Sequence, residues 1–182
     1  MISMPLTTSR LVVREWTDDD ADAAFAVYGS AAVAHWLTPA IDRVPDAGAM
    51  LAVLQAWQEA QRSLVPPLGR WAVQRQDDRA VIGGLAVRRL PPYDEDLEVS
   101  WQVNPLQWGQ GYATEAAGAL ISWAFAHDID ELFAVARPNN TRAIATAKRL
   151  GMEWVGETAK YYGLNLQVYR VRPGDLRADQ PA

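Results

Sequence analysis

The chain has 182 residues, of which 49% are hydrophobic and 21% charged, with a formal net charge of -5. These values suit one globular domain and exclude collagen-like, coiled-coil and wholly disordered chains. The absence of cysteine excludes disulfides, thiolate nucleophiles and sulfur-ligated metal sites. Because the chain is acidic and has no secretory-signal pattern or membrane-length apolar run, we expect a cytoplasmic protein with neither nucleic-acid nor membrane partners.

The N-terminal third predicts one strand and two helices. The apolar run over 11–16 is typical of a strand, and Thr17 followed by three aspartates predicts the start of a helix over 18–32. A second amphipathic helix is predicted over 45–62, where Pro45 suits the first helical turn. The segment 37–44 between the two helices is predicted to be a loop.

The middle of the chain changes to the periodicity of strands. Segments 70–74 and 81–90 predict antiparallel strands, and the loop 91–96 leads to a third strand over 97–103. In that third strand Glu98, Ser100 and Gln102 alternate with four apolar residues, so one face is polar. A glycine-containing turn then precedes a helix predicted over 111–127.

The last third predicts a strand over 132–136, a helix over 140–150 and strands over 154–158 and 167–172. Residues 1–176 therefore form one mixed α/β (α+β) domain in which helices flank a central sheet, with a frayed tail over 177–182.

The turn before the helix over 111–127 is the most informative segment. Gly109 and Gly111 allow a tight backbone turn that presents several amide hydrogens together at the positive end of a helix. Such a turn suits a diphosphate, although the two glycines are equally consistent with a plain strand-to-helix connection. Thr114 stands where the dinucleotide fingerprint has its third glycine, and no Gly-Lys-Ser/Thr follows, so neither common nucleotide motif fits.

The run from Trp108 to Ala116, WGQGYATEA, resembles the acyl-CoA signature of the GNAT acetyltransferases, in the subgroup similar to ribosomal-protein alanine N-acetyltransferases. Segments 9–14, 97–101 and 138–152 match that subgroup in the same order. The resemblance implies a mixed, mostly antiparallel sheet whose splayed parallel strands hold acetyl-CoA as cosubstrate. The cofactor-binding residues that it implies are Trp101, Gln102, Val103, Trp108, Gly109, Gln110, Gly111, Tyr112, Ala113, Thr114 and Asn140.

Three positions depart from the family pattern. Trp108 replaces the usual glutamine or arginine at the head of the turn, so diphosphate binding is expected to depend on backbone amides. Ala143 stands where many relatives have a serine, and Ala147 where many have a proton-donating tyrosine. With two distant histidines and no cysteine, no metal site is expected.

Glu98 is the candidate general base, because a polar face on a helix-covered central strand indicates a cleft. A carboxylate is a weak base for an alkylammonium, so either a water relay or a raised pKa is expected. The alternative is that Glu98 only pairs with Arg88 across the sheet or is solvated. Tyr162 is the candidate proton donor for the leaving thiolate, and the alternative for Tyr161 and Tyr162 is one buried ring beside one ring at the rim.

Trp36 and Ser100 are the candidate acceptor-binding residues, and the acidic loop 91–96 could attract a cationic acceptor. We therefore predict an acetyl-CoA-dependent N-acetyltransferase that acts directly on a primary amine, either a protein N-terminus or a small molecule. The alternative is a catalytically silent acyl-CoA-binding or sensing module. The acceptor, the acyl length and a homodimeric state are left open by the sequence.

Overall fold

A computed structural model describes residues 4–37, 39 and 41–177 of the chain. Its helices are α1 (Ala21–Tyr28), α2 (Ala31–Leu37), α3 (Ala47–Gln61), α4 (Tyr112–Phe125) and α5 (Thr141–Arg149). Its strands are β1 (Leu6–Thr7), β2 (Leu11–Arg14), β3 (Gly69–Arg75), β4 (Val81–Arg89), β5 (Leu97–Val103), β6 (Leu132–Ala136), β7 (Glu153–Thr158) and β8 (Leu166–Val171). Short 3₁₀ turns lie at Asp18–Asp20, Pro105–Gln107 and Pro173–Asp175.

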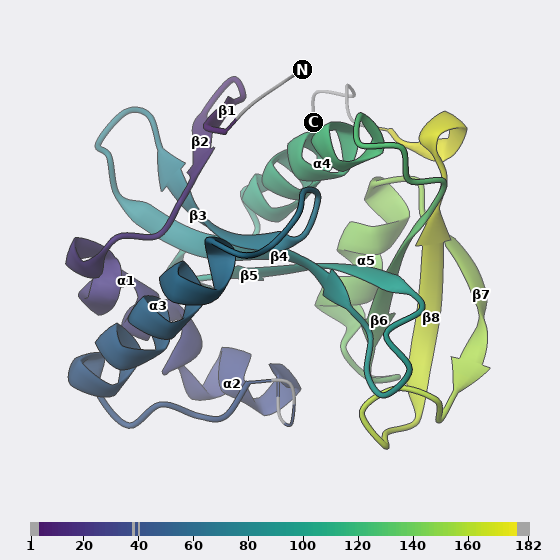
Figure 1. Ribbon diagram of the computed structural model, residues 1–182, viewed down its shortest axis with the longest axis horizontal. Coiled ribbons are helices and arrows are strands. Elements are labelled where there is room, and N and C mark those ends of the chain that lie inside the picture. Colours follow the sequence, from purple (N-terminus) through teal and green to yellow (C-terminus); the bar gives the residue numbers. More distant parts are fainter. Residues whose placement is uncertain (1–3, 38, 40, 178–182) are drawn as a thin grey trace.

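The strands form one sheet in the order β1-β2-β3-β4-β5-β6-β8-β7. Every neighbouring pair is antiparallel except β5 and β6, which are parallel. The predicted fold class, a mixed and mostly antiparallel sheet flanked by helices, is confirmed. The parallel pair lies between the two halves of the sheet, so β6, β8 and β7 extend away from β1–β5 (Figure 1).

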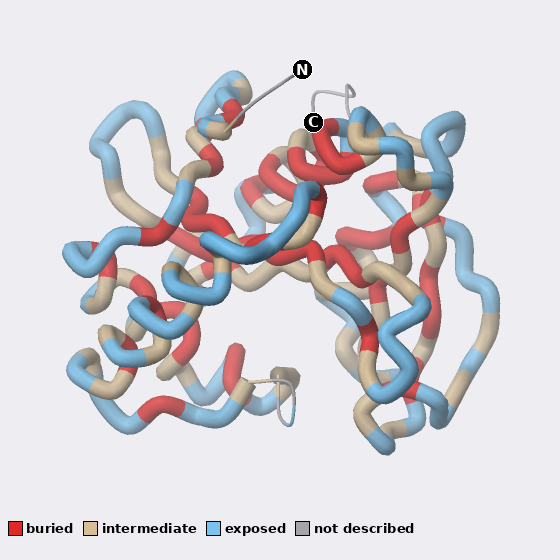
Figure 2. The backbone as a smooth tube through the Cα atoms, in the orientation of Figure 1, coloured by how far each residue is buried: buried red, intermediate tan, exposed pale blue. Residues whose placement is uncertain are grey.

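Helices cover both faces of the first half of the sheet. The residues of α4 pack on one face with alternate residues of the strands, among them Leu11, Trp71 and Leu85. Helices α1 and α3 pack on the other face around Trp16 and Met50. The buried backbone accordingly follows the central strands and α4, whereas the outer loops and β7 are more exposed (Figure 2). This layered packing buries β4 from Ile82 to Val87.

The predicted helix over 18–32 is wrong in its extent. The three aspartates form a 3₁₀ turn, α1 ends at Tyr28 with Gly29 as its C-cap, and the chain restarts as α2. The carbonyl of Ser30 accepts hydrogen bonds from Val33 and Ala34, so it begins this new helix. Consequently Leu37, the first residue of the predicted loop 37–44, belongs to α2, and Trp36 lies on the same helix. The short edge strand β1 was also missed.

The other boundaries differ by at most two residues, for local reasons. Gly111 adopts a left-handed φ of 79° and caps α4, which therefore begins at Tyr112. Asn140 caps α5 by accepting a hydrogen bond from the amide of Ala143 at 3.3 Å. Of the expected tail over 177–182, only Arg177 is described, and its amide donates to the carbonyl of Leu150 at 3.0 Å.

An ion pair fastens α1 to the sheet. The guanidinium of Arg14, on β2, donates to both carboxylate oxygens of the buried Asp20 at 2.8 Å. The amide of Thr17 donates to the same carboxylate at 2.8 Å. Burial alone would raise the pKa of Asp20, but the hydrogen bonds from Arg14 and Thr17 outweigh it and hold that pKa below its ordinary value.

We predict that Asp20→Asn lowers the free energy of unfolding by about 1–3 kcal/mol at neutral pH, because a buried charged hydrogen-bond network loses its anion. The folded pKa is depressed, so this stabilisation is present at neutral pH and is lost as pH falls below about 4. Urea unfolding at pH 7 and pH 3 measures both effects, with the exposed Asp19→Asn as the matched control. An equal loss in the two variants would contradict this account.

Candidate active site

The cleft begins where the two parallel strands separate. Glu98 of β5 and Phe133 of β6 are the only register pair between these strands in the part of the chain that the structure describes. Beyond that pair the strands diverge, and a cleft extends between the two halves of the sheet. The separation of these strands is the feature that the family resemblance implied.

Most of the cleft wall comes from four elements. Strand β5 contributes residues 98–103, β6 its last three residues, α5 its inner face and α2 residues from Ala32 to Leu37. The lining residues from these elements include Val99, Ser100, Trp101, Gln102, Val103, Ala134, Val135, Ala136, Arg142, Ala143, Ala147, Val33, Trp36 and Leu37. The cleft therefore has a largely apolar wall with a few polar groups, as small-molecule sites do.

Three side chains meet at the inner end of the cleft. Glu98 is only 4% exposed, and its Oε2 accepts hydrogen bonds from Arg88 Nε at 2.8 Å and from the Tyr162 hydroxyl at 3.0 Å. Arg88 lies directly opposite Glu98 on β4, and its guanidinium lies 5.6 Å from the centre of the Tyr162 ring. The structure thus brings together the two predicted catalytic residues, and it also shows the expected alternative partner, Arg88.

Tyr162 is held in an unusual conformation between β7 and β8. Its φ of 55° is left-handed, which is uncommon for a residue with a bulky side chain. Burial and the neighbouring charge of Glu98 raise the pKa of the Tyr162 phenol well above its ordinary value, so the hydroxyl keeps its proton at neutral pH. Tyr161 is buried, and its hydroxyl donates to Asp96 at 2.5 Å. One ring is therefore buried and the other faces the cleft.

The glycine turn has the conformation that an anion site needs. Both Gly109 and Gly111 have φ of 79°, a left-handed value that favours glycine. No side chain among the described residues caps the N-terminus of α4, so the first amides of that 14-residue helix keep their hydrogen-bonding capacity for a ligand. A Cβ at Gly109 would meet no atom within 4 Å, so the outer surface of the turn is open.

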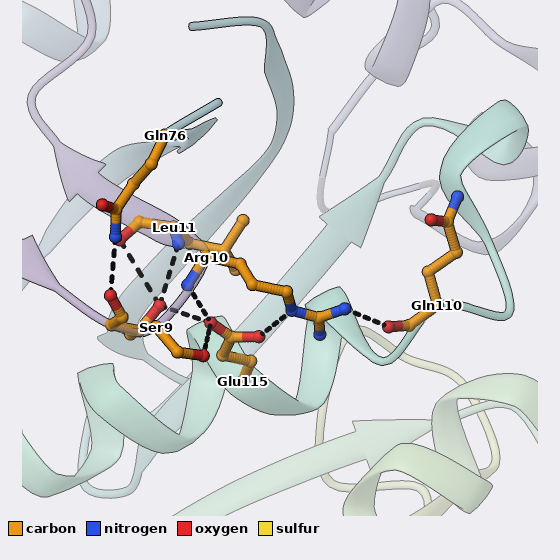
Figure 3. A network of polar contacts seen from close by, with 7 residues as sticks. Ser9, Arg10, Leu11, Gln76, Gln110 and Glu115 are labelled. Atoms are coloured by element: carbon orange, nitrogen blue, oxygen red, sulfur yellow. Dashed lines mark hydrogen bonds and ion pairs between the residues drawn. The ribbon is translucent and has the colours of Figure 1, made fainter. Parts of the chain in front are cut away.

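A polar network fixes the position of this turn (Figure 3). Glu115 Oε1 accepts hydrogen bonds from the Thr8 hydroxyl at 2.6 Å and from the Arg10 amide at 2.9 Å. Arg10 Nε donates to Glu115 Oε2 at 2.7 Å, and its Nη1 donates to the carbonyl of Gln110 at 2.9 Å. Burial would raise the pKa of Glu115, but these hydrogen bonds outweigh it and lower that pKa. Residues 105 positions apart therefore hold the turn against β2.

A second arginine lies on the cleft side of the turn. The Arg142 guanidinium stacks on the Trp108 ring, 3.4 Å from its centre, and both residues line the cleft. The Trp108 indole N–H donates to the carbonyl of Val103 at 2.9 Å, which fixes the ring. The positive charge of Arg142 therefore adds to that of the α4 N-terminus, and an anionic group bound there would interact with both.

The predicted site residues divide into two groups. Lining the cleft are Trp36, Glu98, Ser100, Trp101, Gln102, Val103, Trp108, Ala113, Asn140 and Tyr162. Gly109, Gln110, Gly111, Tyr112 and Thr114 lie in the turn and in α4 outside that lining, and the Tyr112 ring is buried beneath the Arg10 guanidinium. The amide oxygen of Asn140 caps α5, and its NH₂ group could donate to a ligand.

Sequence reasoning did not assign Arg10, Arg142 or Lys160 to this region. Arg10 and Arg142 lie within segments that matched the family, which was the available signal. Lys160 donates to Asp96 at 2.9 Å and lies 3.5 Å from Glu95, so one cation offsets part of the negative charge of the three carboxylates in the acidic loop 91–96. The expectation that this loop attracts a cationic acceptor stays a prediction.

Within the described ranges, no cluster of three or more histidine or acidic side chains is placed to hold a metal ion. No described helix has the length and apolar character that crossing a membrane requires.

Comparisons with known proteins agree with this geometry. A model of the acetyltransferase (GNAT) domain matches residues 10–153. The chain is 25% identical over 158 residues to the uncharacterized N-acetyltransferase YoaA of Bacillus subtilis, covering 86% of each protein. It is 23% identical over 154 residues to the uncharacterized N-acetyltransferase YnaD of the same organism, covering 84% of this chain and 85% of that protein.

Solved structures show the same fold. A GNAT-family acetyltransferase from Bacillus anthracis superposes with a TM-score of 0.77 at 19% identity, covering 93% of this chain and 98% of that one. A ribosomal-protein-S5-alanine acetyltransferase from Vibrio fischeri superposes with a TM-score of 0.73 at 18% identity, covering 96% of this chain and 100% of that one. At these identities the likeness concerns the fold.

Proposed function

Because this chain belongs to the GNAT acetyltransferase family, whose members use acetyl-CoA as cosubstrate, we propose that it acetylates a primary amine within a ternary complex. The acceptor is a protein N-terminus or a small-molecule amine. The observation that carries the proposal is the cluster of Arg88, Glu98 and Tyr162 at the point where β5 and β6 separate. At that point one hydrogen bond joins the candidate base, Glu98, to the candidate acid, Tyr162, beside the cleft.

The residues present fit acetyl-CoA. The uncapped N-terminus of α4 and the open glycine turn suit the diphosphate, and the stacked Arg142 adds positive charge beside them. Acetyl-CoA supplies a thioester whose carbonyl carbon accepts the amine and whose thiolate leaves. The apolar wall of the cleft from β5 and β6 suits the arm that connects these two groups, with Asn140 near the wall.

The cluster can move the proton that amine acetylation releases. Both described hydrogen bonds to Glu98 fall on Oε2, so Oε1 can take a proton from the attacking amine, directly or through water. Tyr162 gives its hydroxyl proton to the leaving thiolate. The Glu98 carboxyl then rotates so that its protonated oxygen takes the place of Oε2, 3.0 Å from the Tyr162 hydroxyl, and returns the amine's proton to Tyr162. In this scheme the C–N bond forms, the C–S bond breaks, and Glu98 and Tyr162 return to their starting states.

Tyr162 would then take the proton-donating role of the tyrosine that many family members have at the position of Ala147. Ala147 and Tyr162 both line the cleft, one from α5 and the other from the segment between β7 and β8. A phenol from a different element thus reaches the cleft, which supports an active enzyme.

One observation favours the alternative function, a silent acyl-CoA-binding module. The Arg88 guanidinium already donates a hydrogen bond to the Glu98 carboxylate at 2.8 Å, so Glu98 has the structural partner across the sheet that a silent module would need. We expect catalysis nonetheless, because Glu98 is only 4% exposed and still borders the cleft together with Tyr162.

The direct test is release of CoA thiol from acetyl-CoA in the presence of a panel of primary amines and peptides with free N-termini. Thiol release that depends on an amine, with the N-acetyl product identified by mass spectrometry, is the expected result. Binding of acetyl-CoA without amine-dependent thiol release would instead support the silent module.

We predict that Glu98→Gln lowers kcat by roughly 100-fold or more at neutral pH, the usual effect of removing a general base, while acetyl-CoA affinity stays nearly unchanged. Tyr162→Phe should lower kcat as well, since it interrupts the return of the proton. Steady-state rates together with calorimetric titration of acetyl-CoA separate these effects. The exposed Glu95→Gln is the control, and a Glu98→Gln rate within about twofold of the parent would remove Glu98 from the mechanism.

A further inference from the structure

A side chain from the N-terminal part of the chain holds the glycine turn (Figure 3). Arg10 comes directly before β2, and its Nη1 donates to the carbonyl of Gln110, 100 positions away, at 2.9 Å. Its Nε donates to Glu115 Oε2 on α4 at 2.7 Å. The guanidinium also lies over the Tyr112 ring, 4.5 Å from its centre. One arginine therefore contacts both the glycine turn and the first turn of the helix that follows it.

Arg10 is itself held in place through its backbone. Its carbonyl accepts a hydrogen bond from the amide of Gln76, just beyond the end of β3, at 2.9 Å. The Gln76 side chain donates to the carbonyl of Thr8 at 2.6 Å, and the Arg10 amide donates to Glu115 Oε1 at 2.9 Å. The backbone of Arg10 is thus fixed to the sheet and to α4, so its guanidinium reaches the Gln110 carbonyl from a defined position.

The contact with Arg10 determines which way the Gln110–Gly111 peptide faces. This peptide is trans, and in a trans peptide the C=O and the N–H point in opposite directions. Because Arg10 holds the carbonyl of Gln110, the N–H of Gly111 points away from the guanidinium. Gly111 is exposed, and no described residue accepts a hydrogen bond from its amide. That amide is therefore available to donate to a ligand.

The two glycines make this orientation depend on an outside constraint. Gly109 and Gly111 lie on either side of Gln110, and glycine has no Cβ to restrict rotation of the adjoining peptides. If the Gln110–Gly111 peptide turned over, its carbonyl oxygen would replace the N–H on the ligand side. A carbonyl oxygen repels a diphosphate, because both are negative. The anion site therefore requires the observed orientation of this peptide.

We propose that Arg10 is a positioning residue for the cofactor, which orients the Gln110–Gly111 peptide so that the Gly111 amide donates to the diphosphate of acetyl-CoA. Glu115 in turn holds the guanidinium of Arg10 at this place. The inference rests on the proposed binding of acetyl-CoA at the glycine turn. The charge of Arg10 is paired with that of Glu115 at 2.7 Å, so Arg10 acts through the geometry of its two donors and not as a free cation.

The test uses three ligands that differ in their phosphate groups. CoA has the diphosphate and a 3′-phosphate, dephospho-CoA has the diphosphate alone, and pantetheine has neither. Calorimetry measures the first two affinities, and titration followed by protein NMR measures the third. We expect Arg10→Gln to weaken CoA and dephospho-CoA by the same factor, roughly 10- to 100-fold, the usual effect of losing a hydrogen bond to a charged group. Pantetheine affinity should change less than about twofold.

Two further variants make the test specific. Arg62→Gln is the matched control, because it removes an exposed arginine that pairs with Glu59 next to α3, and it should leave all three affinities unchanged. Arg10→Lys keeps the charge but has one donor nitrogen in place of Nε and Nη1, so it should weaken CoA and dephospho-CoA as well. Urea unfolding checks that each variant is folded, and Arg10→Lys decides the test if Arg10→Gln is not.

Several outcomes would overturn the inference. One is a CoA affinity within about twofold of the parent in Arg10→Gln. A loss confined to CoA would place Arg10 on the 3′-phosphate, and an equal loss for pantetheine would indicate a distorted cleft. Parent-like affinity in Arg10→Lys, or recovered affinity in the double variant Arg10→Gln/Glu115→Gln, would mean that Arg10 acts through charge.

Failure of the proposed function is measured separately. The affinities require no acceptor, so an absence of acetyl transfer leaves the inference about Arg10 testable by binding. Unaltered CoA affinity in Arg10→Gln would overturn the inference and leave the acetyl transfer intact. Failure of the parent protein to bind CoA would contradict both.

Discussion

The site depends on the separation of two parallel strands beyond a single pair, Glu98 and Phe133. Past that pair the backbone groups of β5 lack the ladder partners that β6 would otherwise provide, and buried backbone groups require partners. An extended ligand with amide groups can supply them, as strand-like ligands do at an open sheet edge. Because the strands separate, side chains of α2 and α5 also line the cleft. One feature of the topology therefore creates both the space for the ligand and the side chains that surround it.

The electrostatics of the site follow from where this separation occurs. Glu98 lies in the last row in which the strands are still paired, so it is buried by the sheet and yet adjoins the cleft. A buried carboxylate needs compensation, which Arg88 and the Tyr162 hydroxyl provide. At the other end of the cleft, a helix N-terminus and Arg142 provide positive potential. In the proposed reaction, one end of the cleft handles the proton and the other binds the anionic part of acetyl-CoA.

Features that depend on local periodicity were predictable, and features that depend on distant contacts were not. The alternation over 97–103 placed Glu98 on a polar face, because the period of a strand is a local property. Tyr162 meets Glu98 across 64 positions of the chain, through a strand order that no local pattern specifies. Arg10 likewise reaches Glu115 over 105 positions. Helix α2 was missed because the break at Gly29 and Ser30 is set by backbone hydrogen bonds, although Gly29 was a visible signal.

A crystal structure of the protein with acetyl-CoA tests the central claim most directly. The account predicts diphosphate oxygens within hydrogen-bonding distance of the backbone amides at Gly111–Ala113. It also predicts that the thioester lies between the separated strands β5 and β6, within reach of the Tyr162 hydroxyl. A diphosphate bound away from the N-terminus of α4, or a thioester on the far side of the sheet from Glu98, would contradict it.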